Sequence, residues 1–119
     1  MKKILLIEDD KVIKKIIEFL LKKEGYDVEI ATDGEQGIKK IVSIKPDLII
    51  TDIMLPYKSG LEITSFSKTN YPEIPIIIIS ILGREDQTIV EAFKLGADDL
   101  IAKPFNPIEL VSRVKRFMN

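Results

Sequence analysis

Five short apolar runs alternate with five amphipathic stretches along the sequence, and this alternation constrains the fold more than any other feature. The apolar runs lie at residues 3–7, 27–31, 48–52, 76–80 and 99–102, and helical spacing of apolar residues appears at 11–24, 34–45, from 59, at about 85–95 and from 106. Strands that alternate with helices build a parallel sheet with helices on both faces. Right-handed crossovers leave few topologies, so we expect an α/β fold with a doubly wound five-stranded parallel sheet in the order 2-1-3-4-5.

Residues with special backbone or capping behaviour mark the ends of the expected elements. Helix stop signals are Gly25, Pro46 and Gly96; helix start signals are Ser59 with Glu62, and Asn106 with Pro107 and Glu109. Both start signals have the spacing of a capping box, in which the first side chain caps the helix and an acid three residues later returns the bond. The four consecutive isoleucines at 76–79 predict a strand that is buried on both faces.

Composition limits the classes of partner and chemistry. The 119 residues predict one domain spanning 1–119, and 18 basic against 19 acidic side chains give no reason to expect a nucleic acid or a membrane as partner. No apolar run approaches the ~20 residues of a membrane span, and the early acidic residues do not fit a signal peptide, so we expect a cytoplasmic protein. With neither Cys nor His, the chain has no thiol nucleophile, imidazole base or ordinary zinc site.

Polar side chains occur where four of the predicted strands end. Glu8 and Asp9 follow the first strand, Asp52 ends the third, Ser80 ends the fourth, and Lys103 follows the fifth. In a doubly wound sheet, ligands bind beyond the carboxyl ends of the strands at the point where the strand order reverses. The expected order places the first and third strands side by side, so the three acids should lie together there.

These groups are suited to phosphoryl transfer with a divalent cation. Three neighbouring carboxylates repel one another, and a hard cation that takes oxygen ligands, Mg²⁺ above all, removes that penalty. Lys103 and Ser80 supply a positive charge and a hydroxyl donor for an anion. Asp52 can act as the nucleophile and form an aspartyl phosphate.

Each residue also has an ordinary structural interpretation. Asp9 or Asp10 could cap the first helix, Asp52 and Ser80 could serve turns, and Lys103 could be a solvated charge. These interpretations must hold independently at four strand ends, whereas one phosphoryl site explains all of them together. The combination therefore favours a functional site.

The sequence resembles the receiver domains of two-component response regulators, of which the bacterial chemotaxis regulator is the simplest type. The resemblance covers essentially the whole chain and rests on LLIEDD, LIITDIMLP, IIIIS, GADD and AKPF in this order and spacing. It implies a non-enzymatic switch that catalyses only its own phosphorylation and dephosphorylation. A histidine kinase or phosphotransfer protein would phosphorylate Asp52, and the domain would then control an output or partner.

The resemblance also implies a role for each site residue. The implied Mg²⁺ ligands are Glu8, Asp9, Asp52 and the backbone carbonyl of Met54. Ser80 would bond a phosphoryl oxygen, Lys103 would pair with the phosphoryl group, and the Lys103–Pro104 peptide would be cis.

Two positions depart from the usual pattern of the family. Leu100 stands where an aromatic residue normally swings inward as the hydroxyl residue, here Ser80, moves toward the phosphoryl group, and Ile81 stands where alanine is usual. The switch would therefore involve Ser80 and Leu100 without an aromatic ring. We also expect slow loss of the phosphoryl group, because Met54 and Leu82 offer no polar group to position water.

The last strand and helix resemble those of receivers that drive winged-helix transcription factors. The residues in question are Asp98, Asp99, Glu109, Arg113 and Lys115, which that subfamily uses in salt bridges across a dimer face. Ile89 replaces the basic residue expected opposite Glu109, so only part of the network is kept. The resemblance thus predicts a homodimer formed on phosphorylation, while the capping box remains the alternative role of Glu109.

Three other functions fit these residues less well. A flavodoxin would bind a flavin phosphate after the first strand, where EDDK would repel it. A receiver-like interaction module would leave Asp52 unused, although the acid, hydroxyl and lysine set is intact. A phosphatase or nucleotide kinase lacks support because the chain has no GxxxxGK[ST] loop.

Overall fold

The computed structural model describes residues 2–118, which form five parallel strands and five helices. The strands are β1 (Lys3–Ile7), β2 (Asp27–Ala31), β3 (Leu48–Asp52), β4 (Ile76–Ile81) and β5 (Asp99–Lys103). The helices are α1 (Lys11–Lys23), α2 (Gly34–Ile44), α3 (Gly60–Asn70), α4 (Asp86–Lys94) and α5 (Pro107–Met118). The strand order is β2-β1-β3-β4-β5, which confirms the predicted doubly wound α/β fold.

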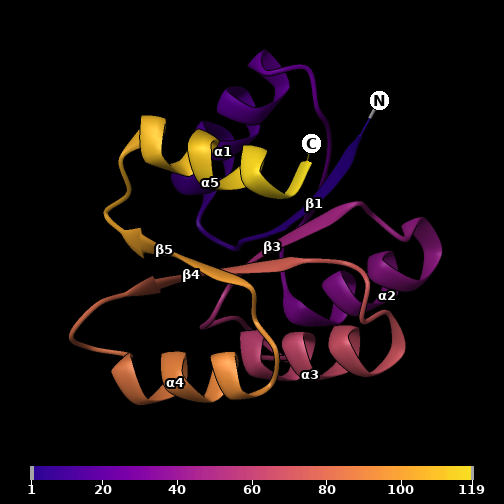
Figure 1. Ribbon diagram of the computed structural model, residues 1–119, viewed down its shortest axis with the longest axis vertical. Helices are drawn as coiled ribbons and strands as arrows, with labels where there is room; N and C mark the ends of the chain where they lie inside the picture. The colour runs from indigo at the N-terminus through magenta and orange to yellow at the C-terminus, as the bar shows by residue number, and fades with distance from the viewer. Residues whose placement is uncertain (1, 119) are drawn as a thin grey trace.

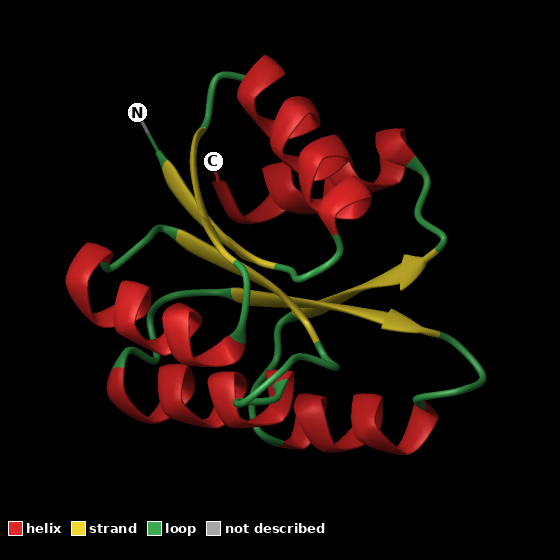
Figure 2. Ribbon diagram, turned by 180° about the vertical axis from the view of Figure 1, so that it is seen from behind, coloured by secondary structure: helices red, strands yellow, loops and turns green. Residues whose placement is uncertain are grey.

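The sheet separates two layers of helices (Figure 1). Helices α1 and α5 pack on one face, and α2, α3 and α4 lie in a row on the other, as the reverse view also shows (Figure 2). The two faces have separate apolar cores, so successive strand residues alternate between them: Ile77 and Ile79 belong to one core, Ile76 and Ile78 to the other. The four isoleucines are therefore buried on both faces, as their sequence predicted.

The strand register aligns the carboxyl ends of the central strands. Ile7 pairs with Thr51 across β1 and β3, and Asp52 pairs with Ile79 across β3 and β4. On the far side of β4, Ile81 pairs with Lys103. Because all the strands are parallel, the residues that follow these positions converge on one edge of the sheet.

The ends of several elements differ by one residue from the prediction. Strands β4 and β5 each extend one residue further, and α4 begins after Glu85 rather than with it. Helix α2 ends at Ile44 because Lys45 takes a left-handed conformation (φ 49°) before Pro46. None of the helices between residues 2 and 118 has the length and hydropathy that a bilayer crossing requires.

The two predicted capping boxes have different outcomes. Ser59 and Glu62 exchange both bonds and start α3, as predicted. Asn106 caps α5 by accepting the amides of Ile108 and Glu109 at 2.9 and 3.2 Å. The prediction for Glu109 was wrong in its second half, because its carboxylate instead accepts the Arg113 Nε–H one turn further along the helix at 3.0 Å.

Candidate functional site

Three acidic side chains meet at the carboxyl edge of the sheet. Glu8, Asp9 and Asp52 each offer a carboxylate oxygen, and these oxygens all lie within 4.8 Å of one another. Glu8 is fully buried and Asp52 nearly so, whereas Asp9 is exposed. The sheet order alone brings them together, because Glu8 follows β1 and Asp52 ends the adjacent β3.

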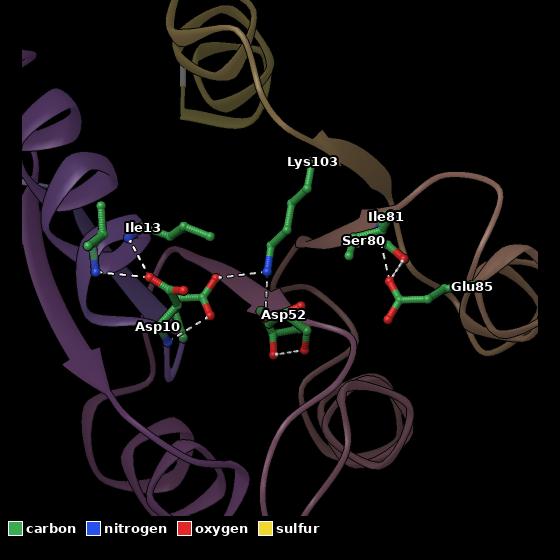
Figure 3. Close-up of polar contacts among 10 residues, drawn as sticks. Asp10, Ile13, Asp52, Ser80, Ile81, Glu85 and Lys103 are labelled. Atoms are coloured by element: carbon green, nitrogen blue, oxygen red, sulfur yellow. Dashed lines mark hydrogen bonds and ion pairs between the residues drawn. The ribbon is translucent and has the colours of Figure 1, made fainter.

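Lys103 reaches across the edge of the sheet to both buried acids. Its Nζ lies 2.8 Å from Asp52 Oδ2 and 3.5 Å from Glu8 Oε1 (Figure 3). Burial lowers the pKa of Lys103, but the hydrogen bond and charge of Asp52, reinforced by Glu8, outweigh it and raise the pKa above its ordinary value. Lys103 is therefore a half-buried ammonium ion paired with acids, and its interpretation as a solvated charge is wrong.

The buried position of Glu8 makes its ionised form unfavourable. Burial is the largest cause, followed by the closeness and the negative charge of the Asp52 carboxylate. The Asp10 backbone N–H and the charge of Lys103 act in the opposite direction. The net effect raises the pKa of Glu8 from 4.5 to about 8.

The donor set fits a hard divalent cation. Among the described residues, the buried Glu8 Oε1 has no hydrogen-bond donor, although it faces Lys103 Nζ. Three carboxylates next to one ammonium ion leave excess negative charge, and one of the three is open to solvent. Oxygen ligands with room for water are the coordination that Mg²⁺ prefers.

Asp10, and not Asp9, caps α1. The Asp10 side chain accepts the amides of Val12 and Ile13 at 2.9 and 3.0 Å, and Figure 3 shows it turned toward that helix. The carboxylate of Asp9 lies instead in the acidic cluster. Of the two roles that the sequence left open for this pair, Asp10 therefore takes the helix cap and Asp9 takes the place in the acidic cluster.

Tight chain reversal after β3 positions Asp52. The Gly60 amide donates to Ile53 O at 2.9 Å, and a Cβ on Gly60 would lie 2.6 Å from both Asp52 O and Ile53 Cα. Only glycine allows α3 to begin this close to the strand. Asp52 itself serves no turn through its side chain, since that carboxylate bonds Lys103, which is 51 residues away in the sequence.

Ser80 does not face the acidic cluster. Its buried hydroxyl donates to Glu85 Oε1 at 2.5 Å, and the Ile81 N–H donates to the same oxygen at 2.7 Å. The hydrogen bonds of the described residues include none between Ser80 and Asp52. Sequence reasoning missed Glu85, which it treated as the first residue of a helix, and no spacing rule identifies such a contact.

The two departures from the family pattern occupy different environments. Leu100 is half-buried, pairs with Ile78 across β4 and β5, and packs against the core under α2, α3 and α4. Ile81 is also half-buried and ends β4. The Lys103–Pro104 peptide is cis, as predicted.

The charges of the predicted dimer face are paired within the chain. These in-chain pairs are Asp98 with Lys68 at 2.7 Å, Asp99 with Arg113 at 2.9 Å, Glu109 with Arg113 at 3.0 Å and Lys115 with Glu24 at 2.7 Å. Ile89, which stands where a basic residue was expected opposite Glu109, is buried in the core beneath α4. A dimer that used these charges would have to share or exchange the present pairs.

Known proteins share both the sequence pattern and the fold. The family model of the response regulator receiver domain matches residues 4–115. The structure is similar to a response regulator receiver domain protein from Clostridium thermocellum, at 30% identity and a TM-score of 0.91 over 100% of this chain and 95% of that chain. It is also similar to the receiver domain of NtrX from Brucella abortus, at 31% identity and a TM-score of 0.89 over 96% of each chain. Chemotaxis response regulator CheY4 of Vibrio cholerae matches at 28% identity and a TM-score of 0.91 over 98% of each chain. With fold, acidic cluster and family match in agreement, this chain belongs to the family of response regulator receiver domains.

Proposed function

We propose that this receiver domain accepts a phosphoryl group on Asp52 and thereby switches a partner or output. The observation that carries the proposal is the contact of Lys103 Nζ with Asp52 Oδ2 at 2.8 Å, beside a buried Glu8 oxygen that has no hydrogen-bond donor within residues 2–118. Lys103 orients the Asp52 carboxylate and leaves a positive charge where a phosphoryl oxygen would arrive. A merely structural ion pair has no need for two further carboxylates within 4.8 Å.

The phosphoryl donor would be a histidine kinase or a phosphotransfer protein that carries phosphohistidine. An Asp52 carboxylate oxygen forms a bond to phosphorus, the bond from phosphorus to the donor nitrogen breaks, and the leaving imidazole takes up a proton. Glu8, Asp9, Asp52 and the Met54 backbone carbonyl would hold Mg²⁺, which when bound neutralises charge on the transferring group. Lys103 would pair with a phosphoryl oxygen, and Ser80 would donate to another after leaving Glu85.

Intact mass spectrometry after incubation with acetyl phosphate tests this proposal. We expect a Mg²⁺-dependent gain of one phosphoryl group in the wild type and no gain in Asp52→Ala. Asp10→Asn is the matched control, because asparagine keeps the cap of α1 while removing a charge next to the acidic cluster. No gain in the wild type under any condition would refute phosphorylation and favour the interaction module.

Location and assembly complete the proposal. A cytoplasmic location is proposed because kinases of this type act on their receivers there.

The homodimer through β5 and α5 stays a prediction, since its charged residues pair within the chain in this structure. Analytical ultracentrifugation of the phosphorylated and unphosphorylated forms would decide it.

A further inference from the structure

A carboxylate outside the acidic cluster holds the hydroxyl that the proposed mechanism needs. Glu85 Oε1 accepts the Ser80 hydroxyl at 2.5 Å and the Ile81 N–H at 2.7 Å. Figure 3 shows Glu85 and Ser80 turned toward each other, on the side of Ser80 away from Asp52 and Lys103. Hydrogen bonds to an ionised acceptor are among the stronger ones in proteins.

The contact with Glu85 excludes the contact with a phosphoryl group. A serine hydroxyl carries one proton and can donate it to one acceptor at a time. Ser80 is fully buried, so its hydroxyl requires a protein or ligand partner in either arrangement. A phosphoryl oxygen on Asp52 and the carboxylate of Glu85 therefore compete for the same proton.

The position of Glu85 couples this competition to α4. Glu85 is the residue before the first turn of α4, yet its side chain does not cap that helix and reaches back to the end of β4. The loop between them is closed by a bond from the Gly83 amide to Asp86 Oδ1 at 2.7 Å. A change in the side chain of Glu85 therefore acts directly on the loop that leads into α4.

Leu100 cannot take over this role. It has no polar group and packs against the apolar core beneath α2, α3 and α4. The residue that reports the state of the Ser80 hydroxyl to α4 must therefore be one that contacts it, and Glu85 does.

We propose that Glu85 is a positioning residue that latches Ser80 in the unphosphorylated arrangement, so that phosphorylation at Asp52 must displace it. This inference rests on the proposed function. The latched arrangement lowers the fraction of molecules that can bind a phosphoryl group with Ser80 engaged, and an apparent Kd rises in inverse proportion to that fraction. Removing the latch should tighten binding of a phosphoryl mimic.

Beryllium fluoride with Mg²⁺ is the probe, because it forms a phosphoryl mimic on an aspartate oxygen without a kinase. Its apparent Kd is measured by NMR titration for the wild type, Glu85→Ala and Glu85→Gln. We expect Glu85→Ala to bind about tenfold more tightly or better, given the strength of a hydrogen bond to a charged group. Glu85→Gln, which keeps a neutral acceptor, should fall between. Glu91→Ala removes an exposed acid from the same helix and should bind as the wild type does.

Two further measurements separate a latch from a general loosening of the loop. The effect of Glu85→Ala should disappear in a Ser80→Ala background, because no hydroxyl remains to be released. The Ile81 amide proton of the wild type should shift upfield when beryllium fluoride binds, as its bond to Glu85 breaks.

The outcomes keep the latch distinct from the proposed function. Absence of Asp52-dependent binding in the wild type would refute the proposed function and the latch together. Binding in the wild type that Glu85→Ala leaves unchanged or weakens would refute the latch alone. A gain that persists without the Ser80 hydroxyl would also refute it.

Discussion

Mg²⁺ binding at the acidic cluster should compete with a proton on Glu8. The folded metal-free protein has a Glu8 pKa of about 8, because the carboxyl is buried and lies beside Asp52. If Mg²⁺ binds only the ionised form of Glu8, its apparent affinity is lower than its affinity for that form. The factor is 1 + 10^(pKa − pH), where the pKa is that of Glu8. That factor is about 100 at pH 6, about 10 at pH 7 and close to one at pH 9.

Isothermal titration calorimetry with Mg²⁺ at several pH values provides the assay. Titrations in two buffers with different ionisation enthalpies report the number of protons released. We expect release of about one proton per Mg²⁺ at pH 6 and about a tenth of a proton at pH 9. Glu8→Gln should bind Mg²⁺ more weakly and lose both the release and the pH dependence. Glu35→Gln, an exposed glutamate on α2, serves as the control.

Two results would refute this reasoning. Affinity that stays constant between pH 6 and pH 9 would show that Glu8 is already ionised in the metal-free protein. Proton release that survives in Glu8→Gln would assign the titration to another group.

The same pKa shift predicts how the stability of the metal-free protein depends on pH. The folded pKa of Glu8 lies above its unfolded value, so its contribution to stability is fully present below about pH 4.5 and is lost as the pH rises through about 8. The Tm gained on adding Mg²⁺ should accordingly be larger at pH 8 than at pH 6. Glu8→Gln should remove most of this difference.

Three further predictions address the rest of the site. Lys103→Met should lower the free energy of unfolding of the metal-free protein by about 3–5 kcal/mol in urea titrations, because it leaves buried carboxylates without a cation. The same variant should be labelled more slowly by acetyl phosphate. Gly60→Ala should cost about 1–3 kcal/mol in the same assay, because its Cβ would lie 2.6 Å from the main chain that follows β3. The phosphorylated wild type should outlive free acetyl phosphate, since Met54 and Leu82 position no water, and Leu82→Asn should shorten that lifetime.

Each of these has its own control and contradicting result. Lys58→Met removes an exposed lysine and should leave stability nearly unchanged. Equal losses at positions 58 and 103 would deny Lys103 its role as the counter-ion of the buried acids. If Gly60→Ala has the same free energy of unfolding as the wild type, the loop after Asp52 can shift to accept the added Cβ, which contradicts the argument from close contact. A lifetime in the wild type no longer than that of free acetyl phosphate would contradict the argument from Met54 and Leu82.

Much of the site was predictable because it depends on strand order more than on side-chain detail. Glu8, Asp52 and Lys103 come at strand ends, and the order β2-β1-β3-β4-β5 places those ends together whatever the loops do. Ser80 was placed on the correct strand, but the sequence does not show that its hydroxyl bonds Glu85.

The local alternation of apolar and amphipathic segments was sufficient to determine the parallel sheet, the two layers of helices and the edge that holds the acids. Burial of apolar residues is a property of the whole pattern, and a few misjudged ends do not change it. Tertiary structure alone decided that Asp10 rather than Asp9 caps α1, that Glu85 takes the Ser80 hydroxyl, and that the charges of α5 pair within the chain. These outcomes depend on which of several competing donors and acceptors lies within about 3 Å, and only the folded backbone determines such distances.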